Sequence, residues 1–412
     1  MTNASGLVAR TSRLDRDVDL LAVAGDDGVL FSRNRVGFAG HGVAVRGARA
    51  EVAAALAAIE SVGALDLLRQ PGTGPVAFGA LPFLPGAPAE FIVPALVVGR
   101  DQDGTCWITT VSARGKPVPD PIETLDAILA GRPAGPQPGP GSFDVRSSRP
   151  PKAWTDAVAT ATARIRAGEL DKVVLAREIV VTADAPIPIA TVLTRLAQNY
   201  PDCFLYLVDG FCGASPELLV GRSGDVVRSQ PMAGTAPRRG DPTADACLAA
   251  NLLASPTYRQ EHQVTIDAVH DELLAFSSYV DYEPEPSVVA LANVQHLATT
   301  VEGRLSHPPA SILELVEALH PTPAVCGRPR DAALALIAEL EHLDRGRYAG
   351  AVGWVDAAGN GQWAVSIRGA SIDGNIARVI GGNGIVGDSD PPTELIETRA
   401  KLQAMLGAIV RP

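Results

Sequence analysis

The chain has 412 residues, of which 46% are hydrophobic and 20% charged, so it can form one large or two smaller globular domains. Its formal net charge of −11, without a basic block, argues against a dedicated nucleic-acid-binding protein. The five cysteines form no CxxC pair, Met1–Val8 lacks a signal-peptide pattern, and no apolar run approaches about 18 residues, so we expect a reduced, cytoplasmic protein that does not span a membrane.

The first part of the chain is predicted to form short strands around one helix. The strands are expected at Asp19–Val23, Gly40–Val45, Pro75–Leu84, Phe91–Val98 and Cys106–Val111. Alanine and apolar residues at helical spacing predict a helix over Ala48–Leu68. Asp103-Gly104 is typical of a hairpin turn, and the many prolines and glycines between Gly131 and Pro151 predict an exposed connector.

The second part alternates predicted helices and strands. The helices are expected at about Trp154–Gly168, Thr243–Ala254, Tyr258–Phe276, Ile312–His320 and Pro329–Leu340. The strands are expected at Lys172–Val181, Cys203–Leu207, Glu217–Val220, Gly350–Val355, Gln362–Ile372 and Ile376–Ile380. The last three strands form a predicted meander, with Asp373-Gly374 as a hairpin turn. This arrangement indicates an α+β protein with antiparallel sheets and helices outside.

A final helix follows the predicted glycine loop Gly381–Gly387, with Asp390 as N-cap and Pro391 in the first helical position. Glu394, Glu397 and Lys401 lie at positions i, i+3 and i+7 of this helix and therefore share one face. Two carboxylates and an ammonium could together hold a metal ion and an anionic ligand. A solvated face with a Glu397–Lys401 ion pair is the simpler alternative.

Two isolated charged residues lie on apolar strands. Lys172 opens the apolar strand over Lys172–Val181 and is either an edge lysine or a base whose pKa is lowered by burial. Glu217 follows the turn at Ser215-Pro216 and is either a strand-end carboxylate or a general acid whose pKa is raised by burial. Arg368 lies among small and apolar residues, as expected of a carboxylate ligand or of an internal ion pair.

Glu261 precedes His262 in the middle of a predicted helix. The neighbouring histidines do not follow the HExxH spacing of zinc sites, whereas a carboxylate oxygen suits Mg²⁺. The tract Gly382–Gly387 matches GxGxxG, but no βαβ unit surrounds it, so we do not predict dinucleotide binding. Its glycines can still let a ligand approach the backbone closely.

These tracts, taken in order, resemble the chorismate-utilising enzymes of the menaquinone, siderophore and tryptophan pathways. The matching tracts are Asp171–Arg177, Gly213–Leu218, Pro231–Thr235, Glu261-His262, His320–Gly327, Ala364–Ala370 and Gly382–Lys401. The resemblance implies the α+β fold of anthranilate synthase component I, with large antiparallel sheets packed together. Residues 151–412 would form the chorismate-binding catalytic region, and residues 1–150 a variable N-terminal part of the same fold.

Within this family the chain is most similar to the isochorismate synthases. Ala324 stands where anthranilate and salicylate synthases commonly have threonine, and Lys172 matches members that use water as nucleophile. The resemblance implies conversion of chorismate to isochorismate, in which water adds at C2 and the C4 hydroxyl leaves. Lys172 would activate the water as a base, and Glu217 would protonate the leaving hydroxyl as an acid.

The resemblance also implies the remaining site. Mg²⁺ would be bound by Glu261 and Glu397, with Glu394 nearby through a water. The substrate carboxylates and the ring would be held by Gly234, Thr235, His296, Ala324, Val325, Tyr348, Arg368, Gly382, Gly384 and Lys401. A buried structural histidine is the alternative for His296.

The resemblance leaves some features and functions open. Thr257 and Tyr258 replace residues of a charged family motif, so a carboxylate beside the metal site is missing, and Arg328 stands where a smaller or apolar residue is common. A salicylate synthase, which would add pyruvate elimination, and a non-catalytic chorismate-binding subunit remain as alternatives. We expect no glutamine amidotransferase subunit and a monomer or weak homodimer. The product could feed a siderophore, menaquinone or salicylate.

Overall fold

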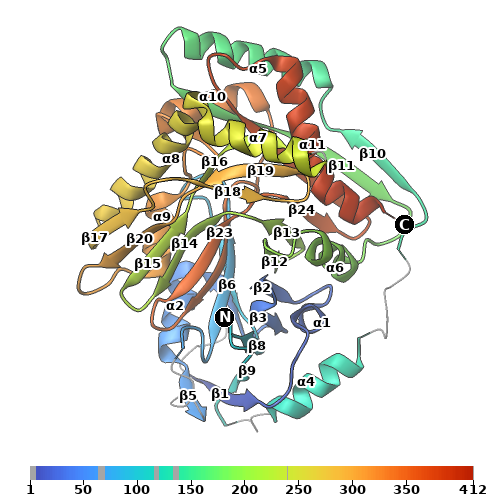
Figure 1. Cartoon of the computed structure of the whole chain (residues 1–412). Helices are drawn as coiled ribbons and strands as arrows, with labels where there is room; N and C mark the ends of the chain where they lie inside the picture. Colours follow the sequence, from blue (N-terminus) through green and yellow to red (C-terminus); the bar gives the residue numbers. More distant parts are fainter. Residues whose placement is uncertain (1–5, 64–69, 116–119, 133–138, 239, 412) are drawn as a thin grey trace.

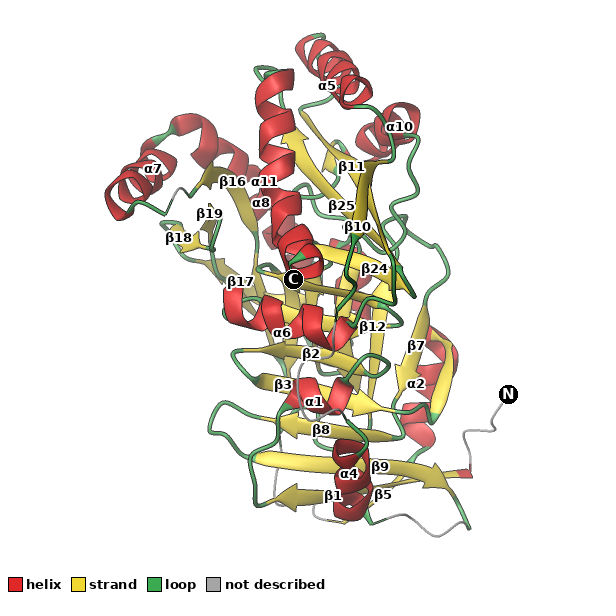
Figure 2. Ribbon diagram, turned by 90° about the vertical axis from the view of Figure 1, so that its right-hand side faces the viewer, coloured by secondary structure: helices red, strands yellow, loops and turns green. Residues whose placement is uncertain are grey.

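Two large sheets form the centre of the molecule, and helices cover their outer faces (Figure 1 and Figure 2). The structure is a computed structural model that describes residues 6–63, 70–115, 120–132, 139–238 and 240–411. The larger sheet has thirteen strands, in the order β10 (Phe143–Ser147), β11 (Lys172–Ala183), β25 (Ile376–Ile385), β24 (Gly369–Asp373), β13 (Phe211–Ser215), β12 (Phe204–Val208), β2 (Val29–Arg33), β3 (Val36–His41), β8 (Leu96–Arg100), β9 (Cys106–Ala113), β1 (Leu7–Leu14) and β5 (Glu60–Gly63), with β21 (Gly327–Arg328) beside β11.

The second sheet and a small third sheet complete the β structure. The second sheet has the order β17 (Ser277–Tyr282), β20 (Val301–Leu305), β15 (Val226–Gln230), β14 (Leu218–Ser223), β23 (Gly361–Val365), β22 (Ala351–Asp356), β6 (Val76–Leu81), β7 (Glu90–Val93) and β4 (Val45–Ala48). The third consists of β16 (Met232–Pro237), β19 (Val294–Ala298) and β18 (Ser287–Ala290). All described strand pairs are antiparallel except β1 with β5.

The helices flank this double layer. They are α1 (Leu20–Ala24), α2 (Arg49–Ala58), α4 (Pro121–Ala130), α5 (Pro151–Arg166), α6 (Ile189–Asn199), α7 (Pro242–Ala254), α8 (Pro256–Leu274), α9 (Ile312–Leu319), α10 (Arg330–Glu341) and α11 (Pro391–Val410). Figure 2 shows α1, α4 and α6 along the outer face of the larger sheet, where their apolar residues form one core cluster with those of α11. No helix among the described residues is long and apolar enough to cross a membrane.

Aromatic side chains fill the space between the two large sheets. Phe31 and Phe38 come from the larger sheet, and Phe78 and Trp354 come from the smaller one. The ring centroids of Phe38 and Trp354 are 4.5 Å apart. Such large rings bury much apolar area, which stabilises the face-to-face packing of the sheets.

Early and late segments of the chain share both large sheets. Strand β2 pairs with β12, and β6 pairs with β22, so the strands coloured blue in Figure 1 continue sheets that are completed much later in the sequence. Backbone hydrogen bonds therefore join the first part of the chain to the second within single sheets. The predicted boundary near residue 150 remains a prediction, although β10 lies inside the stretch Gly131–Pro151 that we expected to be a connector; residues 133–138 of it lie outside the described residues.

The structure confirms the α+β class but corrects several elements. The expected strand Asp19–Val23 is helix α1, because the Asp19 carboxylate accepts from the Leu21 N–H at 3.0 Å and caps a helix. The expected helix Ala48–Leu68 ends at Ala58 and is followed by β5; residues 64–68 lie outside the described residues. Phe91–Val98 forms two strands because Pro94 interrupts the ladder.

Two further predicted strands and one predicted loop are wrong. Gly40–Val45 is not one strand, since β3 ends at His41 and β4 begins at Val45. Gln362–Ile372 breaks at Arg368, whose positive φ of 55° turns the chain from β23 in one large sheet to β24 in the other. Residues Gly381–Ile385 are not a loop but the end of β25, where they pair with β11. The expected meander is therefore split between two sheets.

Candidate active site

A cavity of about 770 Å³, including its open mouth, lies where the larger sheet, the small third sheet and α8 and α11 approach one another. Its lining comes from segments far apart in the sequence: Lys172, Val174, Pro216, Glu217, Met232, Ala233, Gly234, Thr235, Glu261, His296, Ala324, Val325, Tyr348, Ile367, Arg368, Ile380, Gly381, Gly382, Gly384 and Lys401. The lining combines cations, carboxylates and backbone amides with apolar side chains. Such a cavity is suited to a small, polar, anionic ligand.

The floor of the cavity is formed by the neighbouring strands β11 and β25. Alternate residues of a strand face the same side, so Lys172 and Val174 point into the cavity together, as do Gly382 and Gly384. A Cβ atom at Gly384 would lie 2.6 Å from Cε of Lys172. The missing side chain of Gly384 therefore makes room for the lysine to extend over the strand.

Lys172 is buried, with its side chain only 9% exposed, and its ammonium donates to Glu261 Oε1 at 2.7 Å. Glu261 reaches this position from α8, 89 residues away in the sequence. Burial acts to raise the pKa of Glu261, but the charge and the hydrogen bond of Lys172 outweigh that effect and lower it. Glu261 is therefore an ionised carboxylate inside the cavity.

Glu217 lies at the crossing from β13 in the larger sheet to β14 in the smaller one. The Ser215 hydroxyl donates to the Val365 carbonyl at 2.6 Å and accepts from the Glu217 N–H at 3.3 Å, which holds the turn. Burial raises the pKa of Glu217 to about 7, although the Met232 N–H and the charge of Lys172 act in the opposite direction. A buried carboxyl with this pKa can donate a proton near neutral pH.

His296 and Arg368 form the wall beside the small third sheet. Arg368 Nη2 lies 3.4 Å from His296 Nε2, and His296 Nδ1 lies 3.3 Å from the Gly234 carbonyl and 3.1 Å from the Thr235 hydroxyl. A guanidinium only donates, so Nε2 accepts and Nδ1 carries the proton that it donates to the carbonyl. Burial, Arg368 and Lys401 lower the pKa of His296 to about 3, so the ring is neutral at pH 7.

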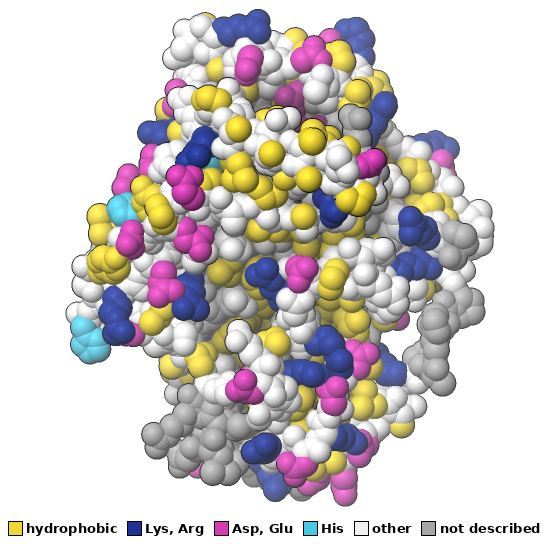
Figure 3. Space-filling view, in the orientation of Figure 1, with side chains coloured by type: hydrophobic (Ala, Val, Ile, Leu, Met, Phe, Trp, Pro, Cys, Tyr) yellow, Lys and Arg dark blue, Asp and Glu magenta, His cyan; other side chains and the backbone are white. Residues whose placement is uncertain are grey.

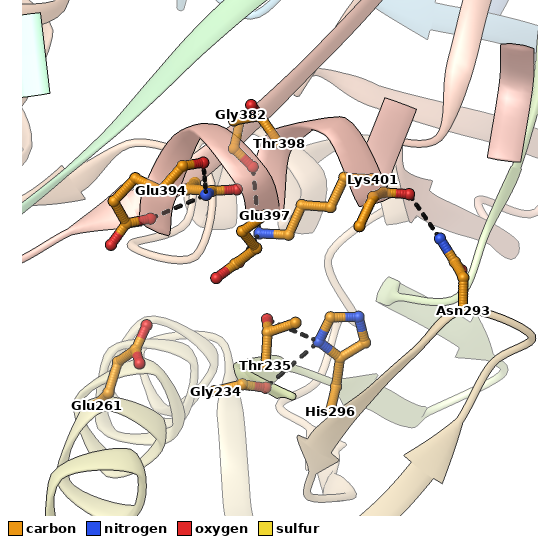
Figure 4. Close-up of polar contacts among 12 residues, drawn as sticks. Gly234, Thr235, Glu261, Asn293, His296, Gly382, Glu394, Glu397, Thr398 and Lys401 are labelled. Carbon is orange, nitrogen blue, oxygen red and sulfur yellow. Dashed lines mark hydrogen bonds and ion pairs between the residues drawn. The ribbon is translucent and has the colours of Figure 1, made fainter. Parts of the chain in front are cut away.

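The face of α11 with Glu394, Glu397 and Lys401 closes the opposite side (Figure 4). Lys401 is 13% exposed, donates to the Gly382 carbonyl at 3.2 Å and forms an ion pair with Glu397 at 2.7 Å. The sequence left open a solvated ion pair or a ligand site. The structure forms the ion pair, but it holds Lys401 in the cavity wall rather than in solvent.

The donor set suits a hard cation such as Mg²⁺. Figure 4 shows Glu261 on α8 on one side, and Glu394 and Glu397 on α11 on the other, with the Glu397 side chain pointing toward Glu261. Burial and then the charges of Glu397, Glu261 and Glu394 raise the pKa of Tyr258, so all three carboxylates act on one hydroxyl. Among the described residues, no group of three or more His, Cys, Asp and Glu side chains is arranged to hold a metal ion, so other oxygen ligands would have to complete the coordination. Carboxylates supplemented by water and ligand oxygens are the usual environment of Mg²⁺.

Glu394 is held in place from the floor of the cavity. Asn383 Nδ2 donates to Glu394 Oε2 at 2.9 Å and to the Glu394 backbone carbonyl at the same distance. Burial raises the pKa of Glu394, and the charge of Glu397 acts in the same direction. This carboxyl is therefore less readily ionised than Glu261.

Every catalytic and substrate-binding residue that the sequence indicated lines this cavity, and so does Glu261. Glu394 and Glu397 are not among the lining residues, although their helix α11 contributes Lys401. The cavity is also lined by mostly apolar residues that the sequence did not indicate: Val174, Pro216, Met232, Ala233, Ile367, Ile380 and Gly381. Val174 and Ile380 could have been found from the period of two on β11 and β25, whereas Met232 and Ile367 depend on how the sheets meet.

Acidic and basic side chains are interspersed over much of the face drawn in Figure 3. Three positively charged side chains, Lys172, Arg368 and Lys401, lie together inside the cavity. Three cations around one cavity favour a ligand with more than one carboxylate.

The chain is similar to several known proteins over most of its length. A family model described as chorismate binding enzyme matches residues 44–410. MenF of Mycobacterium tuberculosis H37Rv is 39% identical over 402 residues, covering 94% of this chain and 95% of that protein. The isochorismate synthase MenF of Bacillus subtilis is 34% identical over 361 residues, covering 84% and 76%. The crystal structure of DhbC from Bacillus anthracis superposes with a TM-score of 0.77 and 30% identity, covering 94% and 98%.

Proposed function

The chain belongs to the chorismate-binding enzyme family, and on that basis we propose that it is an isochorismate synthase that depends on Mg²⁺. The observation that carries the proposal is the presence of Lys172 and Glu217 in one cavity. The exchange of a hydroxyl group on the ring needs a base for the incoming water and an acid for the leaving hydroxyl. A binding protein without a reaction has no use for both.

In the proposed reaction, Lys172 acts in its neutral form, after its ammonium has released to solvent the proton that it donates to Glu261, and it accepts a proton as water bonds to C2 of the chorismate ring. The ring double bonds shift, and the bond between C4 and its hydroxyl breaks. Glu217 gives its proton to the departing hydroxyl, which leaves as water. One water is consumed and one released, so isochorismate is an isomer of chorismate. The pKa of about 7 supports this role, because about half of the Glu217 carboxyl remains protonated at neutral pH.

The substrate would be held through its two carboxylates. Arg368 and Lys401 supply two of the cations that line the cavity, and the backbone near Gly234 and Gly382 permits close approach. The neutral His296 keeps Arg368 oriented through its Nε2 atom. Apolar contacts from Val174, Val325 and Ile380 would fit the ring itself.

Glu261 and Glu397 would bind Mg²⁺, with Glu394 close by. When bound, the ion would neutralise a substrate carboxylate and draw electron density from the ring. The chain's own residues would still supply the proton transfers, because Lys172 and Glu217 both line the cavity.

Replacing Gly384 with alanine is expected to lower kcat by about 10- to 100-fold with little change in stability. The new Cβ would displace the lysine side chain, meeting Cε at 2.6 Å and Nζ at 3.1 Å, and a small misplacement of a catalytic group costs up to about 100-fold in rate. Gly387→Ala is the matched control, because its Cβ would be 3.6 Å from Ile165 Cγ2, an ordinary contact. Equal kcat values for both variants and the wild type would contradict the proposed placement of Lys172.

Product analysis tests the proposed function as a whole. The purified protein is incubated with chorismate, with and without Mg²⁺, and the products are separated by chromatography. Isochorismate alone, formed only with Mg²⁺, is the expected result. Salicylate and pyruvate would instead identify a salicylate synthase. Chorismate binding without turnover under either condition would identify a non-catalytic subunit.

A further inference from the structure

A buried ion pair lies directly behind the cavity without lining it. Glu341 is the last residue of α10, and Arg345 follows four residues later, with each side chain only 2% exposed. Arg345 Nε donates to Glu341 Oε2 at 2.9 Å, and Nη2 makes a second contact with Oε1. The guanidinium also lies over the ring of Phe83, 4.1 Å from its centroid.

The pair is hydrogen-bonded to the backbone of the cavity wall on two sides. Arg345 Nη2 donates to the Val174 carbonyl at 2.6 Å, and Nη1 donates to the Val325 carbonyl at 3.0 Å. Glu341 Oε1 accepts from the Ala176 N–H at 2.7 Å. Val174 and Val325 both line the cavity, and Val174 is two residues beyond Lys172 on the same strand. One ion pair thus joins the lysine-bearing strand to the segment after α9.

Stability alone does not account for this arrangement. Removing two charges from water is costly, and well-packed apolar residues of similar volume often stabilise a protein as well or better. An apolar pair could not replace the directional hydrogen bonds, because the guanidinium of Arg345 donates to carbonyls on two separate backbone segments. The turn after Arg345 also carries Tyr348, whose N–H donates to the Arg345 carbonyl at 2.9 Å. Tyr348 lines the cavity as well.

We propose that the Glu341–Arg345 pair positions Lys172, Val325 and Tyr348 around the substrate and is required for full turnover. Neither residue touches the substrate, so both are positioning residues. The inference rests on the proposed function, because its readout is chorismate turnover.

The test replaces the pair by apolar residues in the double variant Glu341→Leu/Arg345→Met. The expected result is a thermal midpoint close to the wild-type value, a kcat lowered at least 10-fold, and a KM changed by less than about 3-fold, since Arg368 and Lys401 remain in place. Arg345→Lys keeps the positive charge beside Glu341 but cannot reach both carbonyls, and it should show an intermediate kcat.

Arg222→Met serves as the control. Arg222 is also buried and donates to two backbone carbonyls, those of Gly224 and Gly359, each at 2.9 Å, but it does not line the cavity. A kcat within 2-fold of wild type in the folded double variant would overturn the inference, as would an equal kcat loss in Arg222→Met. If the double variant does not fold, a wild-type kcat in Arg345→Lys overturns it, and a lowered kcat with unchanged KM supports it. Absence of turnover in the wild type would instead reject the proposed function itself.

Discussion

Replacing Lys172 with alanine is expected to lower kcat about 1000-fold while leaving chorismate binding within about 3-fold of wild type. General-base catalysis contributes typically about 100- to 10,000-fold, and the variant has no group to accept the proton of the attacking water. The substrate carboxylates would still meet Arg368 and Lys401, which lie on other elements of the cavity. Single-turnover kinetics gives the rate, and titration calorimetry without Mg²⁺ gives the affinity.

A second variant separates catalysis from charge balance. Lys172 donates to Glu261 at 2.7 Å, so alanine also leaves that carboxylate without its partner. Arginine at position 172 keeps a positive charge beside Glu261 but stays protonated, so it cannot act as a base. We expect it to be nearly as inactive as alanine. Lys152→Ala is the matched control, because Lys152 is 82% exposed and forms its ion pair with Asp156 on the surface of α5. Near-normal turnover in Lys172→Ala would show that the base is another group.

Replacing Glu217 with glutamine is expected to lower kcat about 100- to 1000-fold by removing the proton donor. Burial raises the pKa of Glu217 to about 7. In the wild type, kcat/KM should therefore fall as pH rises through about 7, approaching 10-fold per pH unit, because the carboxylate form cannot donate. The residual activity of the glutamine variant should lack this fall. Glu339→Gln provides the control, since Glu339 is 50% exposed and pairs with Arg164 on the surface.

The same raised pKa has a consequence for stability that does not depend on activity. A carboxyl whose pKa is about 7 in the folded chain and about 4.5 when unfolded holds its proton more tightly when folded. Its contribution to stability is present at low pH and declines as pH rises from about 4.5 to 7. The thermal midpoint of Glu217→Gln, relative to wild type, should therefore increase across this range. A constant difference would contradict the burial of an ionisable group at this position.

The sequence indicated which residues belong to the site, but it did not indicate how these residues contact one another. Lys172, Glu217 and Glu261 could each be named from local pattern and resemblance, and α11 could be predicted from Asp390 and Pro391 because caps are local. The hydrogen bond between Lys172 and Glu261 could not be predicted, because tertiary packing brings together residues 89 positions apart. Whether the Glu397–Lys401 ion pair is exposed to solvent or buried also depends on how α11 packs against the sheets, which the sequence does not show.

The errors in secondary structure have the same origin. The predicted loop Gly381–Gly387 is a strand as far as Ile385, because pairing with β11 outweighs the weakening effect of glycine in a strand. Arg368 interrupts what looks like one apolar strand, since the two large sheets need a crossing point there and the residue adopts a positive φ of 55°. Local propensity carries no information about either requirement. The positioning role of the Glu341–Arg345 pair likewise cannot be predicted from the sequence, because it depends on the Val174 and Val325 carbonyls that tertiary packing brings next to Arg345.

The most direct measurement of the proposed reaction follows the oxygen of the incoming water. The wild-type protein is incubated with chorismate and Mg²⁺ in ¹⁸O-labelled water, and the isochorismate formed at early times is analysed by mass spectrometry and carbon NMR. The account predicts one ¹⁸O atom in each product molecule, at the C2 hydroxyl. Isochorismate that carries the unlabelled hydroxyl of the substrate would contradict it, because the hydroxyl would then have moved within one molecule without the water that Lys172 is proposed to activate.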